Sequence, residues 1–448
     1  MRNFIERPRY TCALGGAMAT ATALPKTIPV LHAPPGCASN WAWTQAGGCG
    51  LQVGGYCGGL SMPGSNVQEK EVVFGGAERL EEVLTNALDV MQGDLFVVLT
   101  SCVTEVIGDD VAAVIRPLQD QGVSIIFAET GGFKGNSYYG YDLVLQSLFK
   151  NYALPNQAKV RRRVNLWGIM PSIDPFWRGN LEGIRELLQK LGLEVNSFFT
   201  DEDTLAGIRR AGTAELNIIV SEVYGQLAAQ TCQEIHGIPF LTAPLPIGPS
   251  ATDEFLRNIA QALSLDQEAV EKLITRENEK YYRMIDPLAD CYNDIDLQRY
   301  VAIVGDANYA VSLTRFLADD LGWLPEAVAI TDILDENQET KLAERLAVLQ
   351  SGIRPNVIFA TDSSDIRQQI KTHWFGREKL AGKYNNPLSP AFVIGSSFDR
   401  ELAKDLGAAH LSVSFPVANR AVLDRSYSGY RGGLRLIEDL ISTIIVGR

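Results

Sequence analysis

Short apolar segments alternate with amphipathic helical segments along most of the 448 residues, and this alternation constrains the fold more than any other feature. Strand-length apolar runs recur at residues 28–31, 95–99, 123–128, 164–169, 216–220, 301–304, 357–360 and 391–394. Helical periodicity is found at residues 77–91, 181–191, 313–321 and 434–445. Strands covered by helices on both faces are short and continuously apolar. The pattern therefore predicts an α/β fold of three Rossmann-like domains, with parallel sheets flanked by helices.

Two interruptions divide this alternation into three parts. Pro155 and a basic patch at residues 161–163 form the first, and a long charged helical segment at residues 266–297 forms the second. We expect domains at residues 1–155, 156–295 and 296–448, because each range has a common domain size.

Composition and charge argue against several classes of function. The net charge is −13 and no long run of Lys or Arg exists, so nucleic acid is a poor candidate partner. No stretch of about 18 apolar residues indicates a membrane span. Residues 1–10 lack the apolar core of a secretion signal, so we expect a cytoplasmic protein. In a reducing cytoplasm the seven cysteines are better candidates for thiols or metal ligands than for disulfides.

Three cysteines stand where predicted elements end or begin. Cys37 follows the strand at residues 28–31, Cys102 follows the strand at residues 95–99, and Cys12 follows the N-terminal arm. The carboxyl ends of parallel strands form one binding crevice, so three thiols placed there can converge on an iron–sulfur cluster. Spacing alone fits structural cysteines equally well, because cysteine is among the most buried residue types.

A glycine-rich segment at residues 34–63 interrupts the regular pattern. It contains eight glycines and three cysteines, among them Cys49 and Cys57. Glycine permits tight turns, and a long irregular loop in a compact domain is usually functional. A disordered lid is the alternative interpretation.

Several local motifs occur in a fixed order. They are Tyr10-Thr-Cys12-Ala-Leu-Gly-Gly-Ala17, His32-Ala-Pro-Pro-Gly-Cys37, Glu69-Lys-Glu-Val-Val-Phe-Gly-Gly76, Thr100-Ser-Cys102-Val-Thr-Glu-Val-Ile-Gly-Asp-Asp110, Gly132-Phe-Lys-Gly135 and Pro246-Ile-Gly-Pro-Ser-Ala-Thr-Asp-Glu-Phe255. Together they resemble nitrogenase component 1, the family of the catalytic α and β subunits and their assembly-scaffold relatives. The resemblance runs from about residue 8 to the C-terminus, and its most specific part is the motif that starts at Thr100.

The resemblance implies that Cys12, Cys37 and Cys102 hold an iron–sulfur cluster at the interface with an α-type subunit. The cluster is of the [8Fe-7S] P-cluster type or a simpler [4Fe-4S] cluster. Some β subunits of the family add a serine ligand just before a Phe-x-Gly motif. Gly132 occupies that position here, which puts an additional serine ligand in doubt, although Ser137 is nearby.

The same resemblance separates the two subunit types. In the family, the α subunit holds the active-site cofactor through one cysteine and one histidine. The matching positions here are Ser221 and Ser428, and a hydroxyl is a poor ligand for iron or molybdenum. The stretch at residues 103–105 is β-like, whereas residues 68–74 are α-like. We therefore expect a β-type subunit with no catalytic residue of its own.

The implied function is that of an oxidoreductase subunit. Its cluster relays electrons from an ATP-dependent [4Fe-4S] iron protein to a cofactor in the α subunit of an α2β2 heterotetramer. The glycine-rich loop differs from Mo, V and Fe nitrogenase β chains, which favours a nitrogenase-like enzyme of sulfur metabolism such as methylthio-alkane reductase, cleaving C–S bonds. The alternatives are an N2-reducing nitrogenase β subunit, a cofactor-assembly scaffold, a tetrapyrrole reductase subunit and a metal-free sensor.

The remaining candidates receive structural interpretations. Cys49 and Cys57 are not expected to be ligands, and Cys232 and Cys291 are expected to be core or structural residues. His32 is expected to be a hydrogen-bond partner beside the cluster loop.

Overall fold

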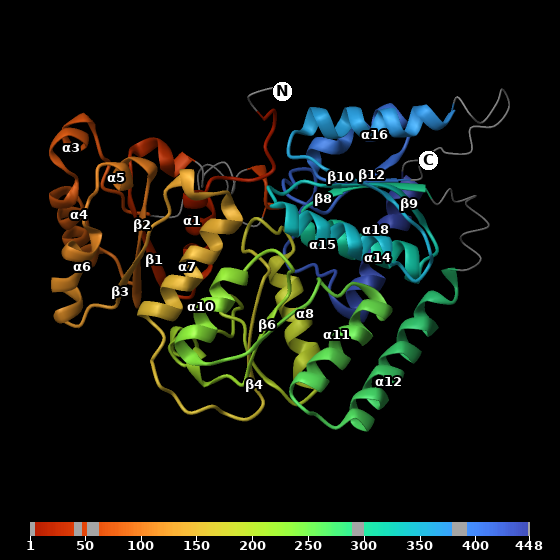
Figure 1. The fold of residues 1–448 in the computed structure, drawn as a ribbon, viewed down its shortest axis with the longest axis horizontal. Helices are drawn as coiled ribbons and strands as arrows, with labels where there is room; N and C mark the ends of the chain where they lie inside the picture. The colour runs from red at the N-terminus through yellow and green to blue at the C-terminus, as the bar shows by residue number, and fades with distance from the viewer. Residues whose placement is uncertain (1–4, 40–46, 52–61, 289–299, 379–391, 447–448) are drawn as a thin grey trace.

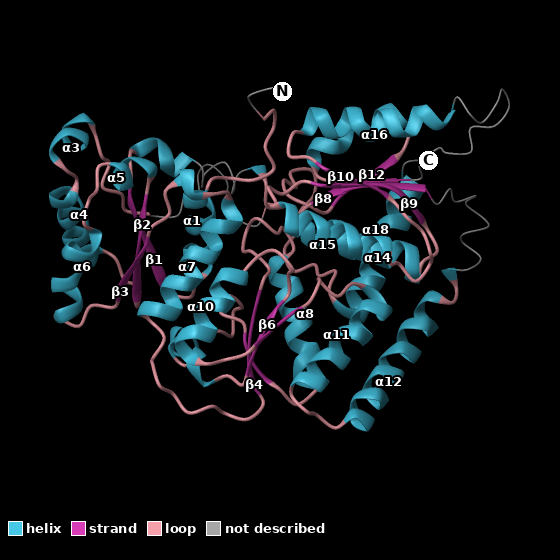
Figure 2. Cartoon of the chain, in the orientation of Figure 1, coloured by secondary structure: helices cyan, strands magenta, loops and turns pink. Residues whose placement is uncertain are grey.

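The computed structural model describes residues 5–39, 47–51, 62–288, 300–378 and 392–446. These residues form three separate parallel sheets flanked by helices, which confirms the predicted fold class (Figure 1, Figure 2). One sheet lies within each of the three ranges expected from the sequence.

The N-terminal sheet has the strand order β1-β2-β3. Its strands are β1 Thr27–His32, β2 Leu95–Thr100 and β3 Ile125–Ala128, and its helices are α1 Ala13–Ala23, α3 Glu69–Phe74, α4 Ala77–Val90, α5 Cys102–Val106, α6 Val111–Asp120 and α7 Ser137–Asn151. Successive β2 side chains point to opposite faces. Val97 packs in the core beside α1 and α7, whereas Phe96 and Val98 pack with α4 and α6. This two-sided burial explains why the strand is apolar throughout.

The middle sheet has the order β5-β4-β6-β7. Its strands are β4 Arg163–Trp167, β5 Glu194–Asn196, β6 Leu216–Ile219 and β7 Phe240–Thr242, and its helices are α8 Trp177–Lys190, α9 Leu205–Arg209, α10 Gln226–His236, α11 Gly248–Ala262 and α12 Gln267–Ile285. Helix α10 lies on the side of the N-terminal domain and packs along α7, so that α7 lies between α1 and α10 (Figure 1).

The C-terminal sheet has the order β10-β9-β8-β11-β12. Its strands are β8 Tyr300–Gly305, β9 Leu324–Ile330, β10 Asn356–Phe359, β11 Phe392–Gly395 and β12 Ala409–Ser412, and its helices are α14 Ala307–Arg315, α15 Glu336–Ala347, α16 Ser363–Glu378, α17 Arg400–Leu406 and α18 Gly429–Val446. One face is covered by α16 and α17, which pack Trp374 and Leu402 against Val304 and Val393.

The final helix returns to the middle of the molecule. Helix α18 contacts α8, α11 and α12 as well as β12. One continuous apolar core contains Leu99 of the N-terminal sheet, Ile218 of the middle sheet, Ile303 of the C-terminal sheet and Leu436 of α18. The three sheets therefore share buried surface.

Several element boundaries differ from the sequence expectations. Strands β5, β7, β9 and β12 were not predicted; three are only three or four residues long, and β9 carries Pro325 and Glu326, which obscure its apolar pattern. Helices α8 and α18 begin four and five residues earlier than predicted, at Trp177 and Gly429. The helix predicted at residues 313–321 is the end of α14 followed by a π-helical turn at Phe316–Asp320.

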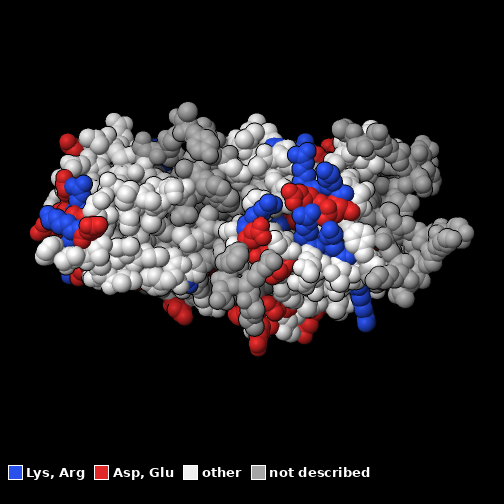
Figure 3. Space-filling model, turned by 90° about the horizontal axis from the view of Figure 1, so that it is seen from above, with Lys and Arg blue, Asp and Glu red and all other residues white. Residues whose placement is uncertain are grey.

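The surface mixes charges of both signs. Seen from above, many basic side chains lie beside acidic ones instead of forming one continuous basic area (Figure 3). Arg367, for example, pairs with Glu401 and Asp405 across α16 and α17. No helix within the described ranges has the length and apolarity that crossing a membrane requires.

Candidate metal centre

Cys12 lies between the N-terminal arm and the loop that follows β3. It precedes α1 in extended conformation and forms an isolated antiparallel bridge with Asn136. The next residue, Ala13, donates its backbone N–H to the carbonyl of Gly135 at 3.0 Å. These contacts fix the backbone of Cys12 against the loop at residues 131–136.

Cys37 lies in the short 3-10 helix η1 Pro35–Ala38, which follows β1. Its N–H donates to the carbonyl of Pro34 at 3.1 Å, so the two prolines and the turn set its position. Burial raises the pKa of the Cys37 thiol, and the nearby Cys12 and Cys102 raise it further. A cation bound beside this thiol would act in the opposite direction and favour its thiolate form.

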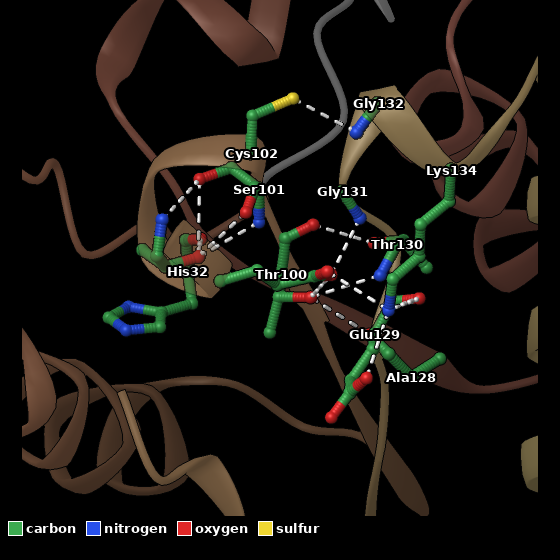
Figure 4. A network of polar contacts seen from close by, with 12 residues as sticks. His32, Thr100, Ser101, Cys102, Ala128, Glu129, Thr130, Gly131, Gly132 and Lys134 are labelled. Carbon is green, nitrogen blue, oxygen red and sulfur yellow. Dashed lines mark hydrogen bonds and ion pairs between the residues drawn. The ribbon is translucent and has the colours of Figure 1, made fainter. Parts of the chain in front are cut away.

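Cys102 is the first residue of α5, directly after β2. Ser101 caps this helix, accepting from the N–H of Thr104 at 3.4 Å, while its own N–H donates to the Thr104 hydroxyl at 3.0 Å. The Sγ atom of Cys102 accepts the backbone N–H of Gly132 at 3.0 Å (Figure 4). Cys102 is exposed on the surface of the chain, whereas Cys12 and Cys37 are half-buried.

Gly132 lies between the side chains of Cys12 and Cys102. A Cβ atom there would lie 3.1 Å from Cβ of Cys12 and 3.2 Å from Sγ of Cys102. The structure therefore brings Cys12 and Cys102 together with Gly132 between them, and Cys37 lies near enough for both to raise its pKa. The crowding also gives a physical reason for the absence of a serine at this position.

The donor set is of the type that holds iron–sulfur clusters. Thiolates are the ligands of such clusters, and an N–H donated to sulfur stabilises its negative charge. No three Cys, His, Asp or Glu side chains in the described part of the chain are placed to hold one metal ion. Ligands of a cluster lie further apart, because they bind different irons.

Glu105 supports the loop that carries Gly132. Its Oε1 atom accepts from the Thr100 hydroxyl and from the N–H of Gly131, both at 2.6 Å, and its Oε2 atom pairs with Lys134 at 2.9 Å. Thr100 also accepts the N–H of Thr130 at 2.9 Å (Figure 4). This network ties the ends of β2 and β3 together beside Cys102, and the sequence analysis did not identify it.

His32 is held by protein groups on both sides of its ring. Its Nε2 atom lies 2.9 Å from Asp109 and its Nδ1 atom 3.0 Å from the Ser65 hydroxyl. Burial lowers the pKa of His32, while Asp109 acts in the opposite direction. The ring is thus a hydrogen-bond partner beneath the loop of Cys37, as expected.

Of the other cysteines, Cys49 and Cys232 lie within the described residues. Cys232 is fully buried in the core on α10, where burial raises the pKa of its thiol to about 11, which confirms the structural interpretation. Cys49 is buried where it forms a parallel bridge with Val417 of the C-terminal domain. Cys57 and Cys291 lie outside the described residues.

Ser221 and Ser428, which the resemblance matched to cofactor-ligand positions of the α subunit, are engaged in protein contacts. Ser221 accepts the N–H of Tyr224 at 2.8 Å. Ser428 donates to the carbonyl of Asn180 at 3.0 Å and lies 2.9 Å from the Ser426 hydroxyl. Both serines are almost fully buried; Ser221 holds the turn between β6 and α10, and Ser428 links α8 to the start of α18.

Comparison with known proteins identifies the family. The model of the nitrogenase component 1 type oxidoreductases matches residues 12–445. The chain belongs to this family. Its membership confirms that the protein is a component of an oxidoreductase.

Individual relatives from this family are β chains. The molybdenum-iron protein β chain of Sinorhizobium fredii is 24% identical over 466 residues, covering 98% of this chain and 84% of the relative. The vanadium-iron protein β chain of Trichormus variabilis is 25% identical, covering 96% and 91%. A solved structure described as nitrogenase Cp1 at pH 6.5 has a TM-score of 0.80 at 21% identity, covering 100% of this chain and 94% of that one. These relatives agree with the β-type resemblance in the sequence.

Proposed function

We propose that this chain is the β-type subunit of a nitrogenase-like reductase and that Cys12, Cys37 and Cys102 form its half of an interfacial iron–sulfur site. The observation that carries the proposal is that Cys12 and Cys102 meet at the backbone of Gly132, with Cys37 near enough for both to raise its pKa. The cluster, either the [8Fe-7S] P-cluster type or [4Fe-4S], supplies one-electron transfer when bound.

The chain's own groups orient the thiols and set their surroundings. Gly132 donates its N–H to Cys102, and Cys37 is held half-buried in its turn. Hydrogen bonds to sulfur and exclusion of water are the two means by which a protein adjusts the potential of such a site. The site therefore combines a polar contact at one ligand with partial burial at the other two.

A second chain completes the site. Three thiols from one chain do not fill the coordination of a multi-iron cluster, and Cys102 is exposed where a partner would bring further ligands. We propose an α-type subunit as that partner, in an α2β2 heterotetramer that an ATP-dependent [4Fe-4S] iron protein reduces. The active-site cofactor belongs to the α subunit, because Ser221 and Ser428 are committed to hydrogen bonds here.

For the substrate, we propose methylthio-alkanes, with cleavage of a C–S bond, in preference to N2. The support is the glycine-rich loop around Cys49, which distinguishes the sequence from Mo, V and Fe nitrogenase β chains. The related chains named above belong to nitrogenases, so reduction of N2 is the second candidate. Assays of the purified complex with both substrates distinguish the two candidates. N2 reduction without C–S cleavage would contradict the proposal of methylthio-alkanes. Turnover of neither, with cofactor transfer to another protein, would indicate an assembly scaffold.

The ligand assignment is tested by anaerobic purification with the co-expressed partner, followed by iron analysis and EPR. About eight interfacial irons indicate a P-type cluster, and about four indicate [4Fe-4S]. Cys37→Ala and Cys102→Ala should each lower the iron content and change the EPR signal. Cys232→Ala is the control, because this thiol lies in the core of the middle domain. Full iron content in all three variants would rule the assignment out.

A further inference from the structure

The N-terminal arm is tied to the C-terminal domain three residues before Cys12. The guanidinium of Arg9 donates to both carboxylate oxygens of Asp399 at 2.7 Å, and also to the Ser396 hydroxyl at 2.7 Å. Both members of the pair are almost fully buried, with side-chain exposures of 2% and 4%. Figure 1 shows the arm running from beside the C-terminal sheet towards α1. A buried bidentate pair defines orientation as well as distance.

The arm has a second attachment upstream of Arg9. The N–H of Glu6 donates to Asp362 at 2.6 Å, and the Ser363 hydroxyl donates to the carbonyl of Arg7 at 3.0 Å. The C-terminal domain therefore holds the residues that precede Cys12 at several positions. Cys12 itself forms a bridge with Asn136 of the N-terminal domain.

Residues 48–50 of the glycine-rich segment contact the same domain. Gly50 donates its N–H to the carbonyl of Val417 at 2.9 Å, and Val417 donates its N–H to Gly48 at 2.7 Å. Val422 donates its N–H to Gly50 at 2.8 Å. Buried Cys49 lies at the centre of this short pairing.

The two attachments belong to one hydrogen-bonded unit of the C-terminal domain. Asp399, which binds Arg9, ends the turn η6 Ser397–Asp399. Ser397 donates its N–H to Pro416 at 2.8 Å, and its hydroxyl accepts the N–H of Ala418 at 2.7 Å. Burial alone would raise the pKa of Asp399, but the charge of Arg9 lowers it below its usual range, so the pair is ionised.

We propose that Arg9 is a positioning residue for Cys12, and that the C-terminal domain, through Arg9 and the Gly48–Val417 contact, fixes the arm of Cys12 and residues 48–50 relative to each other. The inference rests on the proposed function only for its consequence, the retention of iron. The positioning itself is a property of the chain without metal. Movement of the C-terminal domain would then alter the position of Cys12 relative to Cys102.

The test uses the full chain, purified and freed of metal, with iodoacetamide as the probe and peptide mass spectrometry as the readout. Arg9→Ala and Asp399→Asn should each raise the alkylation rate of Cys12 about tenfold through local opening of the arm, and leave that of Cys102 unchanged. Cys232 reports global unfolding, because it is fully buried. Arg367→Ala is the matched control, since its ion pairs lie on the surface of the same domain.

If Arg9→Ala also exposes Cys232, that variant is globally unfolded. The test then uses Asp399→Asn and Arg9→Lys, because both substitutions change the arm less. Unchanged Cys12 alkylation in a folded variant would overturn the inference. Iron retention by the complex gives the second readout. If Cys12→Ala keeps its iron while Arg9→Ala still exposes Cys12, the positioning is correct and the ligand assignment is not. If Cys12→Ala loses iron while the Arg9 variants keep native alkylation rates and native iron, the inference alone fails.

Discussion

The backbone N–H of Gly132 points at the sulfur of Cys102, 3.0 Å away, although 30 residues separate them in the sequence. The contact forms because β2 and β3 are neighbours, so the loops that follow them meet at one edge of the sheet. The Cys102 thiol thus depends on the loop at residues 131–136, which also carries Asn136, the bridge partner of Cys12.

Replacement of Gly132 should disturb two thiols at once. In Gly132→Ala the new methyl group would lie 3.1 Å from Cys12 Cβ and 3.2 Å from Cys102 Sγ, so both side chains must shift slightly. We expect a loss of about 1–3 kcal/mol in stability and a lower iron content. Gly36→Ala is the matched control beside Cys37, because a Cβ atom there meets no neighbour within 4 Å. Equal iron content and EPR spectra in the two variants would contradict this account.

Glu105 should contribute more to the stability of the fold than Glu129, although both pair with Lys134. Glu105→Ala removes the carboxylate that accepts hydrogen bonds from the Thr100 hydroxyl and the Gly131 N–H. We expect a loss of about 1–3 kcal/mol in the free energy of unfolding and faster alkylation of Cys102. Glu129→Ala removes an ion pair to Lys134 from a side chain that is 63% exposed, so we expect about 0.5 kcal/mol or less. Urea unfolding and thiol labelling would measure both effects; a larger effect at Glu129 would refute the prediction.

Asn180 should stabilise the junction of α8 and α18 without affecting the cysteines. It is fully buried, accepts the N–H of Tyr427 at 2.8 Å and donates to the Tyr309 hydroxyl at 2.8 Å. Asn180→Ala should lower stability by about 3 kcal/mol, because it leaves buried polar groups unpaired. Exposed Gln189 on the same helix gives the control, Gln189→Ala. Thermal unfolding measures the change, and an unaltered EPR signal is expected from the folded fraction.

Asp142 should make stability depend on pH. It accepts the N–H groups of Gly225 and Ala228 at the start of α10, and burial raises its pKa to about 7. The folded state therefore binds a proton that the unfolded state releases between about pH 4 and 7, so stability falls as pH rises through this range. Asp142→Asn should reduce that slope by on the order of 1 kcal/mol per pH unit.

The comparison for this pH effect is Asp405→Asn. Hydrogen bonds from Lys371 and Arg367 lower the pKa of Asp405, so its contribution is lost only in more acidic solution. Urea titrations at pH 5, 6 and 7 should therefore show the wild-type slope in Asp405→Asn and a flatter one in Asp142→Asn. The same slope in both variants would show that Asp142 does not titrate there.

The sequence predicted most of the sheet architecture and the proximity of Cys12 and Cys102, because local patterns indicate where the strands end. Buried strands such as β2 are apolar on both faces, and Cys102 lies two residues after the end of β2. The sequence could not predict contacts between residues that are far apart along the chain. Arg9 and Asp399 are 390 residues apart, and no local feature of either marks a buried ion pair.

Short or polar elements were also missed for physical reasons. Strand β5 has three residues and β9 contains Pro325 and Glu326, so neither shows a continuous apolar run. The role of Gly132 is visible only once Cys12 and Cys102 are placed beside it. The sequence identified this glycine solely as the position where a serine is found in some relatives.

The burial of α7 between α1 and α10 has a consequence for biosynthesis. During translation, the N-terminal sheet emerges from the ribosome well before α10, which supplies the second neighbour of α7. Until then, one side of α7 remains exposed to water. Such a nascent chain presents apolar surface that chaperones bind, and a fragment ending at residue 155 should aggregate when expressed by itself.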